Sequence, residues 1–219
     1  MTISRTDVIC ASQVALLGFV TRNLRALTVS ILPQELMLNF YYDYKPTEEE
    51  IKLSQVVSKK VASGFNNILV KEQQILLPQP QPVPLKKKDQ WIYQRFEGNP
   101  RPFKIQTLFK DITLKSVRCA LQFALLGSVT PNLRAVSIGF IEKDLTINFY
   151  YDKKRQNNSQ DPYEEHLPPR TYFNTVSSFD GATGKVNCFV IPEPEKIPLQ
   201  GDSIWVYIRY EKPLQILKS

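Results

Sequence analysis

The sequence predicts an α+β protein made of two tandem αββαββ domains, each a four-stranded, mostly antiparallel sheet with two helices on one face. Three observations lead to this prediction. A long stretch of sequence occurs twice, helical and strand periodicities follow each other in the same order in both copies, and 219 residues leave room for two domains of about a hundred residues each.

The repeat is evident on direct alignment. Residues 13–43 and 122–152 align without a gap and are identical at 17 of 31 positions. Farther along, "PLKKKDQWIYQRFE" (84–97) aligns with "PLQGDSIWVYIRYE" (198–211), and the offset has grown from 109 to 114. The second copy therefore holds five extra residues between 152 and 198. A unit of this length is a small domain rather than a solenoid repeat, so duplication and fusion explain the sequence.

Domain boundaries follow from the repeat and from turn-forming residues. We expect a first αββαββ repeat at 1–98, a linker at 99–109 and a second αββαββ repeat at 110–219, with the boundary in the Gly/Asn/Pro-containing "GNPRPFKIQ" (98–106). The second repeat carries an insertion around 153–170.

The first copy shows each element clearly. Apolar residues recur at helical spacing over 5–18, which predicts an amphipathic helix. "LRALTVSIL" and "ELMLNFYYD" alternate and are rich in β-branched and aromatic residues, which predicts two strands joined by a hairpin turn at Pro33 and Gln34. A second helix is predicted in "PTEEEIKLSQVVSKKVASG", where Thr47 caps it and Glu50 completes a capping box. Strands in "NILVKEQQILL" and "QWIYQRFE" complete the domain.

The second copy follows this plan except in its second helix. Pro162, Pro168 and Pro169 fall within the corresponding segment, and proline does not fit a helix interior. We therefore expect a loop through about Pro169 and then a shortened helix near 170–179. Because the copies differ most here, and loops on a rigid scaffold often carry specificity, this insertion is a candidate binding element.

Composition limits the class of protein. The formal net charge is +7, but the excess is spread over both halves, so nucleic acid is a less favoured partner than protein. Cys10 and Cys119 occupy equivalent positions inside predicted helices and are expected to be small, buried apolar residues. With Cys188, they form no CxxC pair that would indicate a zinc or redox site. No apolar run approaches the roughly 20 residues of a membrane span, and we expect a cytoplasmic protein without membrane contact.

Catalytic motifs are not evident. The sole histidine, His166, lies in the insertion and has no counterpart in the first copy. GxSxG, HExxH, Walker-type and GxGxxG patterns do not occur in the sequence. Asp43 and Asp152 each end a predicted strand, where a carboxylate can be catalytic but is also a good turn residue. We therefore predict no catalytic residues, metal or cofactor, and keep an enzyme centred on these two aspartates as a third alternative.

One face of each predicted sheet is not needed for the core. Alternation places apolar residues toward the helices and a shared polar and aromatic set on the opposite face. The candidate partner-binding residues are Asn39, Tyr41, Asp43, Trp91, Tyr93, Arg95, Asn148, Tyr150, Asp152, Trp205, Tyr207 and Arg209. Tyr, Trp and Arg beside small polar neighbours are typical of interaction surfaces. Three alternatives remain open: the two copies pack on each other as an intramolecular pseudo-dimer, these faces meet an outside partner, or they are ordinary exposed sheet. Arg25 and Arg134, shared just before the first strand, are expected to form local salt bridges or caps.

These patterns resemble a family of small bacterial proteins of about a hundred residues, some of them immunity proteins of toxin–immunity systems. The resemblance is carried by Ala15-Leu16-Leu17-Gly18, Asn23-Leu24-Arg25-Ala26, Phe40-Tyr41-Tyr42-Asp43, Trp91, Tyr93 and Arg95, and recurs at Ala124-Leu125-Leu126-Gly127, Asn132-Leu133-Arg134-Ala135, Phe149-Tyr150-Tyr151-Asp152, Trp205, Tyr207 and Arg209. It covers nearly all of each copy except the insertion. It implies an α+β domain and a protein partner, and it supplies no catalytic residues.

The function predicted is that of a non-enzymatic protein-binding protein, an immunity-type inhibitor that neutralises a bacterial toxin by occlusion. Sheet-face aromatics or the insertion would cover the active site of the toxin domain. The alternative is a nucleic-acid-binding protein that stacks bases on Trp91, Tyr93, Trp205 and Tyr207 and holds phosphates with its basic loops.

Overall fold

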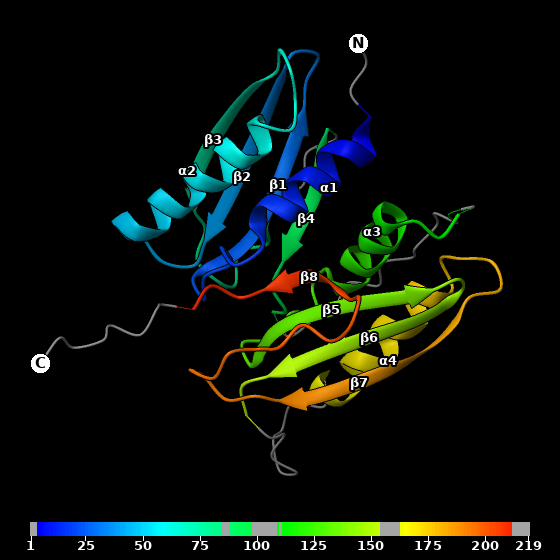
Figure 1. Ribbon diagram of the computed structural model, residues 1–219. Coiled ribbons are helices and arrows are strands. Elements are labelled where there is room, and N and C mark those ends of the chain that lie inside the picture. The colour runs from blue at the N-terminus through cyan, green and yellow to red at the C-terminus, as the bar shows by residue number, and fades with distance from the viewer. Residues whose placement is uncertain (1–3, 85–87, 98–108, 110, 154–162, 212–219) are drawn as a thin grey trace, which may run out of the picture.

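The computed structural model describes residues 4–211 apart from 85–87, 98–108, 110 and 154–162. The first repeat contains α1 (Arg5–Leu16), β1 (Leu24–Ile31), β2 (Glu35–Tyr42), α2 (Glu48–Ala62), β3 (Leu69–Leu76) and β4 (Asp89–Gln94). The second contains α3 (Leu114–Leu125), β5 (Leu133–Ile141), β6 (Asp144–Tyr151), α4 (Tyr163–Val176), β7 (Thr183–Val190) and β8 (Ile204–Ile208). The predicted order αββαββ is thus confirmed in both copies (Figure 1).

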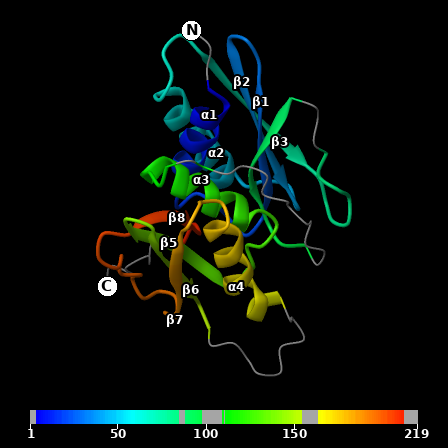
Figure 2. The same cartoon turned by 90° about the vertical axis from the view of Figure 1, so that its right-hand side faces the viewer.

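Each repeat forms its own four-stranded sheet. The strand orders are β3-β2-β1-β4 and β7-β6-β5-β8, so the two sheets have the same topology. Only β2 with β3 and β6 with β7 pair in parallel, because a helix crosses between those strands. The other pairs are antiparallel, as predicted, and the β1–β2 hairpin turns at Pro33 and Gln34. Figure 2 shows the first sheet from a direction in which α1 and α2 lie on one side of it.

The start of α2 forms because its side chains satisfy the free backbone groups of the first turn. The Glu50 backbone N–H donates to Thr47 Oγ1 at 3.2 Å, and the Thr47 backbone N–H donates to Glu50 Oε2 at 2.9 Å. This is the predicted capping box. Three glutamates in the first turn and two lysines in the last also suit the helix dipole.

The core lies between the helices and the facing side of the sheets. The helix-facing residues of β2, namely Leu36, Leu38, Phe40 and Tyr42, are all buried, as are their counterparts in β6. Each such side chain contributes about 1.5–3 kcal/mol when it leaves water. The buried cluster is continuous through both repeats, so the two domains share one apolar core.

Helix α4 corrects a prediction. The expected loop through Pro169 and short helix near 170–179 are wrong, because the helix runs from Tyr163 to Val176 with Pro168 and Pro169 inside it. The prolines remove backbone donors, yet Leu167, Thr171 and Thr175 of the same helix are buried. Burial of this face offsets the local cost, and helix propensity gives way to tertiary packing.

The last strand of each sheet corrects a second prediction. Simple alternation placed Tyr93 and Tyr207 on the face away from the helices, and this is wrong. Thr28 pairs with Trp91 but Leu27 pairs with Tyr93, so a β-bulge leaves Ile92 as an extra residue. The same shift occurs in β8. Tyr93 and Tyr207 therefore join the helix-side core, whereas Trp91 stays on the opposite face.

The two repeats contact each other through equivalent residues. Gly18 donates its backbone N–H to the Ile208 carbonyl at 3.0 Å, and Gly127, its equivalent, donates to the Gln94 carbonyl at 3.0 Å. Tyr210 donates likewise to the carbonyl of Val20, and the equivalent Phe96 to that of Val129. Such reciprocal contacts are the pattern of a two-fold interface.

The cysteines correct a third prediction. The prediction that Cys10 and Cys119 are small, buried apolar residues misses their pairing, because they form a disulfide between α1 and α3, with Cα atoms 6.3 Å apart. Only the approach of the two repeats brings these residues together, because they are 109 positions apart in sequence. Disulfides persist in oxidising compartments, so the cysteine content no longer supports a cytoplasmic location, which stays a prediction.

The predicted linker at 99–109 lies outside the described residues except for Phe109, and the insertion is described only in part, so the domain boundaries stay predictions. In the described parts of the chain, no helix combines the length and the hydropathy that a membrane crossing requires.

Candidate partner-binding site

Most of the twelve predicted site residues are inaccessible. Eight are buried, namely Asn39, Tyr41, Trp91, Tyr93, Asn148, Tyr150, Tyr207 and Arg209. Asp43, Arg95, Asp152 and Trp205 are half-buried. Burial favours structural roles for most of this set, and partner contact by them stays a prediction.

On the face away from the helices, the predicted residues contact one another. Asn39 Nδ2 donates to Thr28 Oγ1 at 3.3 Å in the first repeat, and Asn148 Nδ2 donates to Ser137 Oγ at 3.2 Å in the second. The ring of Tyr150 lies between two other aromatic rings, those of Phe189 and Trp205, with centroid distances of 5.2 and 5.5 Å. Burial raises the pKa of Tyr41 and Tyr150. Of the four tryptophan and tyrosine residues proposed as base-stacking platforms, Trp205 alone is half-exposed.

A buried arginine supports the same end of each sheet. Arg25 donates from Nε and Nη2 to the two carboxylate oxygens of Glu97 at 2.5 and 2.6 Å, and also to the carbonyl oxygens of Leu77 and Gln81. Arg134 makes the equivalent paired contacts with Glu211. Both arginine side chains are only 1% exposed, so the expected local salt bridges are confirmed.

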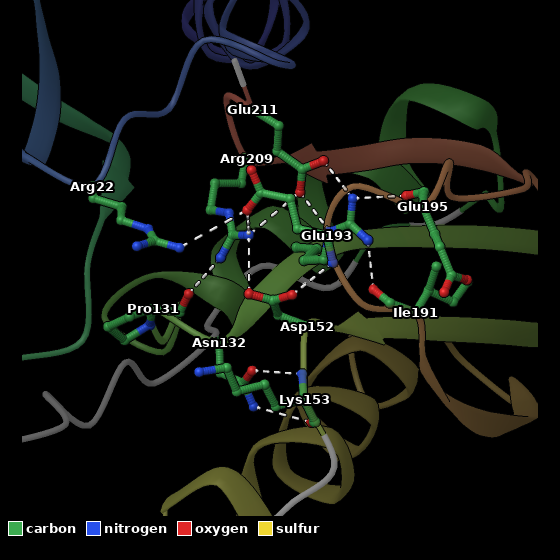
Figure 3. A network of polar contacts seen from close by, with 11 residues as sticks. Arg22, Pro131, Asn132, Asp152, Lys153, Ile191, Glu193, Glu195, Arg209 and Glu211 are labelled. Carbon is green, nitrogen blue, oxygen red and sulfur yellow. Dashed lines mark hydrogen bonds and ion pairs between the residues drawn. The ribbon is translucent and has the colours of Figure 1, made fainter. Parts of the chain in front are cut away.

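A second arginine extends each network toward the surface. In the first repeat, Arg95 donates to Asp43 Oδ2 at 3.0 Å and to the Arg22 carbonyl at 2.8 Å. In the second repeat, shown in Figure 3, Arg209 donates to the Pro131 carbonyl at 2.6 Å and to Glu193 Oε2 at 3.1 Å. The carboxylates of Asp152 and Glu211 lie 3.7 and 3.4 Å from the same Arg209 nitrogen.

The two aspartates at the strand ends are anchors of these networks. Asp43 accepts from the backbone N–H of Gln79, and Asp152 accepts from that of Glu193. Partial burial raises the pKa of each carboxyl, but these hydrogen bonds and the neighbouring arginines outweigh burial, so both pKa values lie below the usual range. A carboxylate held in this way is a poor general base at neutral pH.

The networks differ between repeats in their charge. Glu193 of the second repeat stands where the first has Gln79, which adds a carboxylate beside Arg209. Arg22 of the first repeat lies across from it, with Nη2 at 3.9 Å from Glu193 Oε2, and the second repeat has Pro131 at the equivalent position. Arg22 of the first repeat and Glu193 of the second therefore face each other (Figure 3).

Above this contact lies a cleft of about 760 Å³ built from both repeats. We call it the inter-repeat cleft, and its lining residues are Thr21, Arg22, Asn23, Tyr44, Lys45, Thr47, Glu49, Glu50, Leu53, Glu193, Arg209, Tyr210 and Glu211. Tyr44 is 74% exposed, and the Tyr210 hydroxyl donates to Glu49 Oε1 at 2.7 Å across the repeats. This hydrogen bond raises the pKa of Tyr210.

Sequence reasoning missed the exposed residues of this cleft. It selected residues that both copies share, and these are mainly residues that maintain the fold. Arg22 and Tyr44 differ between copies, since Pro131 and Lys153 stand at the equivalent positions. The signal that finds them is therefore a difference between the two copies within stretches that are otherwise similar.

No group of three or more His, Cys, Asp or Glu residues among those that the structure describes is arranged to hold a metal ion, and His166 is exposed. The cleft contains hydrogen-bonding and aromatic groups suited to recognising a protein surface.

Comparison with known proteins agrees with the fold. No curated protein matches this chain. The model of the MafI2 immunity protein family matches residues 5–97 and again residues 115–211, which is one match for each repeat. Since these matches cover most of the chain, the protein belongs to the MafI2 immunity protein family, with two copies of the family's domain in tandem.

Proposed function

We propose that this protein neutralises a partner toxin by occlusion, and that the inter-repeat cleft is the surface that contacts the toxin. The immunity family indicates a protein-binding, non-enzymatic role. Occlusion as the mode of neutralisation and the cleft as the place of contact go beyond what the family match indicates.

The proposal depends on one observation: the cleft combines exposed Tyr and Arg side chains with a buried arginine that is held in place by hydrogen bonds. Tyr44 is 74% exposed and the Arg22 side chain is 70% exposed. Tyr and Arg are the residue types that most often dominate binding energy at protein interfaces. Beneath them Arg209, only 4% exposed, is fixed by several acceptors, so the cleft needs little ordering when a partner binds.

The tandem arrangement supports a single partner per chain. We infer that the two repeats imitate a homodimer, because equivalent residues contact each other across the interface. Divergence of Arg22 from Pro131 and of Glu193 from Gln79 makes the two sides of this pseudo-dimer different. One side alone then carries the complete set of cleft residues.

Nucleic-acid binding has less support. Trp91, Tyr93 and Tyr207 are at most 7% exposed, which leaves no face for a base to stack on. Trp205 alone of the proposed platforms is accessible, and it is half-buried.

The test is affinity capture from lysate of the native host, with and without nuclease, followed by binding measurements on the captured protein and growth rescue in cells that express it. Tyr44→Ala is expected to weaken binding by at least about 2 kcal/mol, roughly thirtyfold. Phe173→Ala is the matched control, because Phe173 is an aromatic residue on α4 that is 69% exposed and lies outside the cleft lining.

Three outcomes contradict the proposal in different ways. Loss of the captured protein after nuclease treatment indicates a nucleic-acid partner. Loss of binding with Trp205→Ala but not with Tyr44→Ala moves the contact to the sheet face of the second repeat. Binding without rescue of growth shows that the contact does not neutralise the toxin.

A further inference from the structure

We propose that the inter-repeat cleft receives a basic side chain of the partner, the guanidinium of an arginine or the ammonium of a lysine. This inference rests on the proposed function, since it assigns the chemistry of the group that the toxin inserts. Three features of the cleft support it: the negative charge of its lining, the weak ion pair between Arg22 and Glu193, and the two tyrosine rings beside these residues.

The cleft is locally acidic in a basic protein. Its lining holds three cationic side chains and four carboxylates, which are Arg22, Lys45, Arg209, Glu49, Glu50, Glu193 and Glu211. The chain as a whole has a net charge of +7. The Asp152 carboxylate, 3.7 Å from Arg209, adds a further negative charge just behind the lining. A positively charged group of a partner is therefore attracted to this cleft and repelled by most of the remaining surface.

All four carboxylates already accept a hydrogen bond, and the two less exposed ones, Glu50 and Glu211, accept more than one. Glu211 forms the paired contact with buried Arg134, and Glu50 accepts from Thr21 at 2.8 Å and from Asn23 at 3.1 Å. Glu193 is different, because its side chain remains 37% exposed although it contacts Arg209. With Glu49, which is also exposed, it is one of the two lining carboxylates that a cation can reach from outside.

A guanidinium from another domain already lies beside Glu193. Arg22 comes from the first repeat, its nitrogen is 3.9 Å from the Glu193 carboxylate, and its side chain is 70% exposed. This contact is at the limit of an ion pair and is worth little in water. Arg22 therefore shows how a cation approaches Glu193 and can move aside at small cost when a better placed one arrives.

Aromatic rings complete the site. Tyr44 and Tyr210 both line the cleft, and the Tyr210 hydroxyl is held by Glu49 at 2.7 Å. A cation that enters beside Glu193 and Glu49 can thus also contact a ring face, which adds a cation–π contribution.

The first experiment uses a small probe and does not need the partner. N-acetyl-arginine amide is titrated into the full chain, with N-acetyl-citrulline amide as its neutral isostere, and backbone amide shifts are followed by NMR. We expect saturable shifts at Tyr44, Glu49 and Glu193 with the arginine probe only. Equal shifts with citrulline, or no saturable shift with arginine, would overturn the inference.

Glu193→Gln supplies the matched variant, because the first repeat carries glutamine at this position within the same network. The Glu193→Gln substitution is expected to lower the affinity for the arginine probe about tenfold. Glu195→Gln removes an exposed carboxylate outside the cleft lining and is expected to leave this affinity unchanged. Equal binding by the Glu193→Gln variant and the parent protein contradicts the inference.

The partner itself separates this inference from the proposed function. If the cleft receives a basic side chain, Tyr44→Ala and Glu193→Gln both lower the affinity for the captured protein. Added salt then reduces the loss of affinity caused by Glu193→Gln. If Tyr44→Ala weakens binding and Glu193→Gln does not, the cation inference is wrong while the docking surface stands. If neither variant changes binding, the cleft is not the docking surface and both fail.

Discussion

The rings of Tyr93 and Tyr207 lie parallel across the two repeats, with centroids 6.5 Å apart and planes 4° from each other. The two residues are equivalent in sequence, so each repeat contributes the same ring to this contact. Burial raises the pKa of both hydroxyls, in keeping with their place in the shared core.

Removal of either ring should destabilise both repeats together. We expect Tyr93→Ala to lower the free energy of unfolding by about 3–5 kcal/mol, because it opens a cavity in the core. A double-mutant cycle with Tyr207→Ala, measured by urea unfolding, should give a coupling of about 0.5–1.5 kcal/mol. Tyr44→Ala is the control, since that ring is 74% exposed and its loss should leave stability unchanged. Strict additivity of the two core substitutions would show that the rings do not interact.

The Cys10–Cys119 disulfide should stabilise the pairing of the repeats. It closes a long loop, so the unfolded chain loses entropy, and the combined Cys10→Ser and Cys119→Ser variant is expected to unfold about 2–5 kcal/mol more easily than the oxidised parent. Alkylation under denaturing conditions, read by mass spectrometry, should find one free thiol before reduction and three after it. Cys188→Ser is the control, because it removes a cysteine outside the disulfide and should leave the free energy of unfolding nearly unchanged. Three free thiols in protein purified without reductant would contradict this prediction.

The buried arginine pairs should matter far more than a surface pair. Glu211→Gln leaves Arg134, whose side chain is 1% exposed, without its counter-charge, so we expect a loss of about 3–5 kcal/mol. Glu35→Gln makes the same chemical change in the pair with Lys71, where the lysine is 50% exposed, and should cost less than about 1 kcal/mol. Thermal and urea unfolding of the two variants measure these losses in the free energy of unfolding. Similar losses for both would mean that burial does not strengthen the Arg134 contact.

Stability should fall in acid because of Asp43 and Asp152. Folding lowers the pKa of both carboxyls below the value of about 3.9 that an aspartate has in the unfolded chain. Near that pH the unfolded chain therefore binds more protons than the folded protein does. Their contribution is therefore complete above that pH and is lost as the pH falls through the lower, folded-state pKa values. Urea unfolding from pH 7 to pH 3 should show a shallower acid decline for the Asp43→Asn and Asp152→Asn double variant than for the parent. Parallel profiles would exclude these residues as the source.

Much of the fold follows from local pattern. The repeat, the order of elements, the capping box at Thr47 and Glu50 and the hairpin at Pro33 depend on near neighbours, and the sequence displays them directly. The family resemblance rests on the same shared residues. The pairing of Arg25 and Arg134 with nearby acids was also predictable, because an arginine beside apolar strand residues needs a counter-charge.

Other features were decided only when distant segments met. Alternation could not anticipate the bulges that turn Tyr93 and Tyr207 into the core, and proline content could not show that packing would hold α4 together through Pro168. The disulfide and the contact between Arg22 and Glu193 join residues of different repeats. By itself the sequence determined two copies of one α+β domain and the type of partner to expect. Only the three-dimensional structure shows which aromatic residues stay accessible and which charged residues of the two repeats meet, because burial and charge pairing across an interface depend on distances that no local pattern encodes.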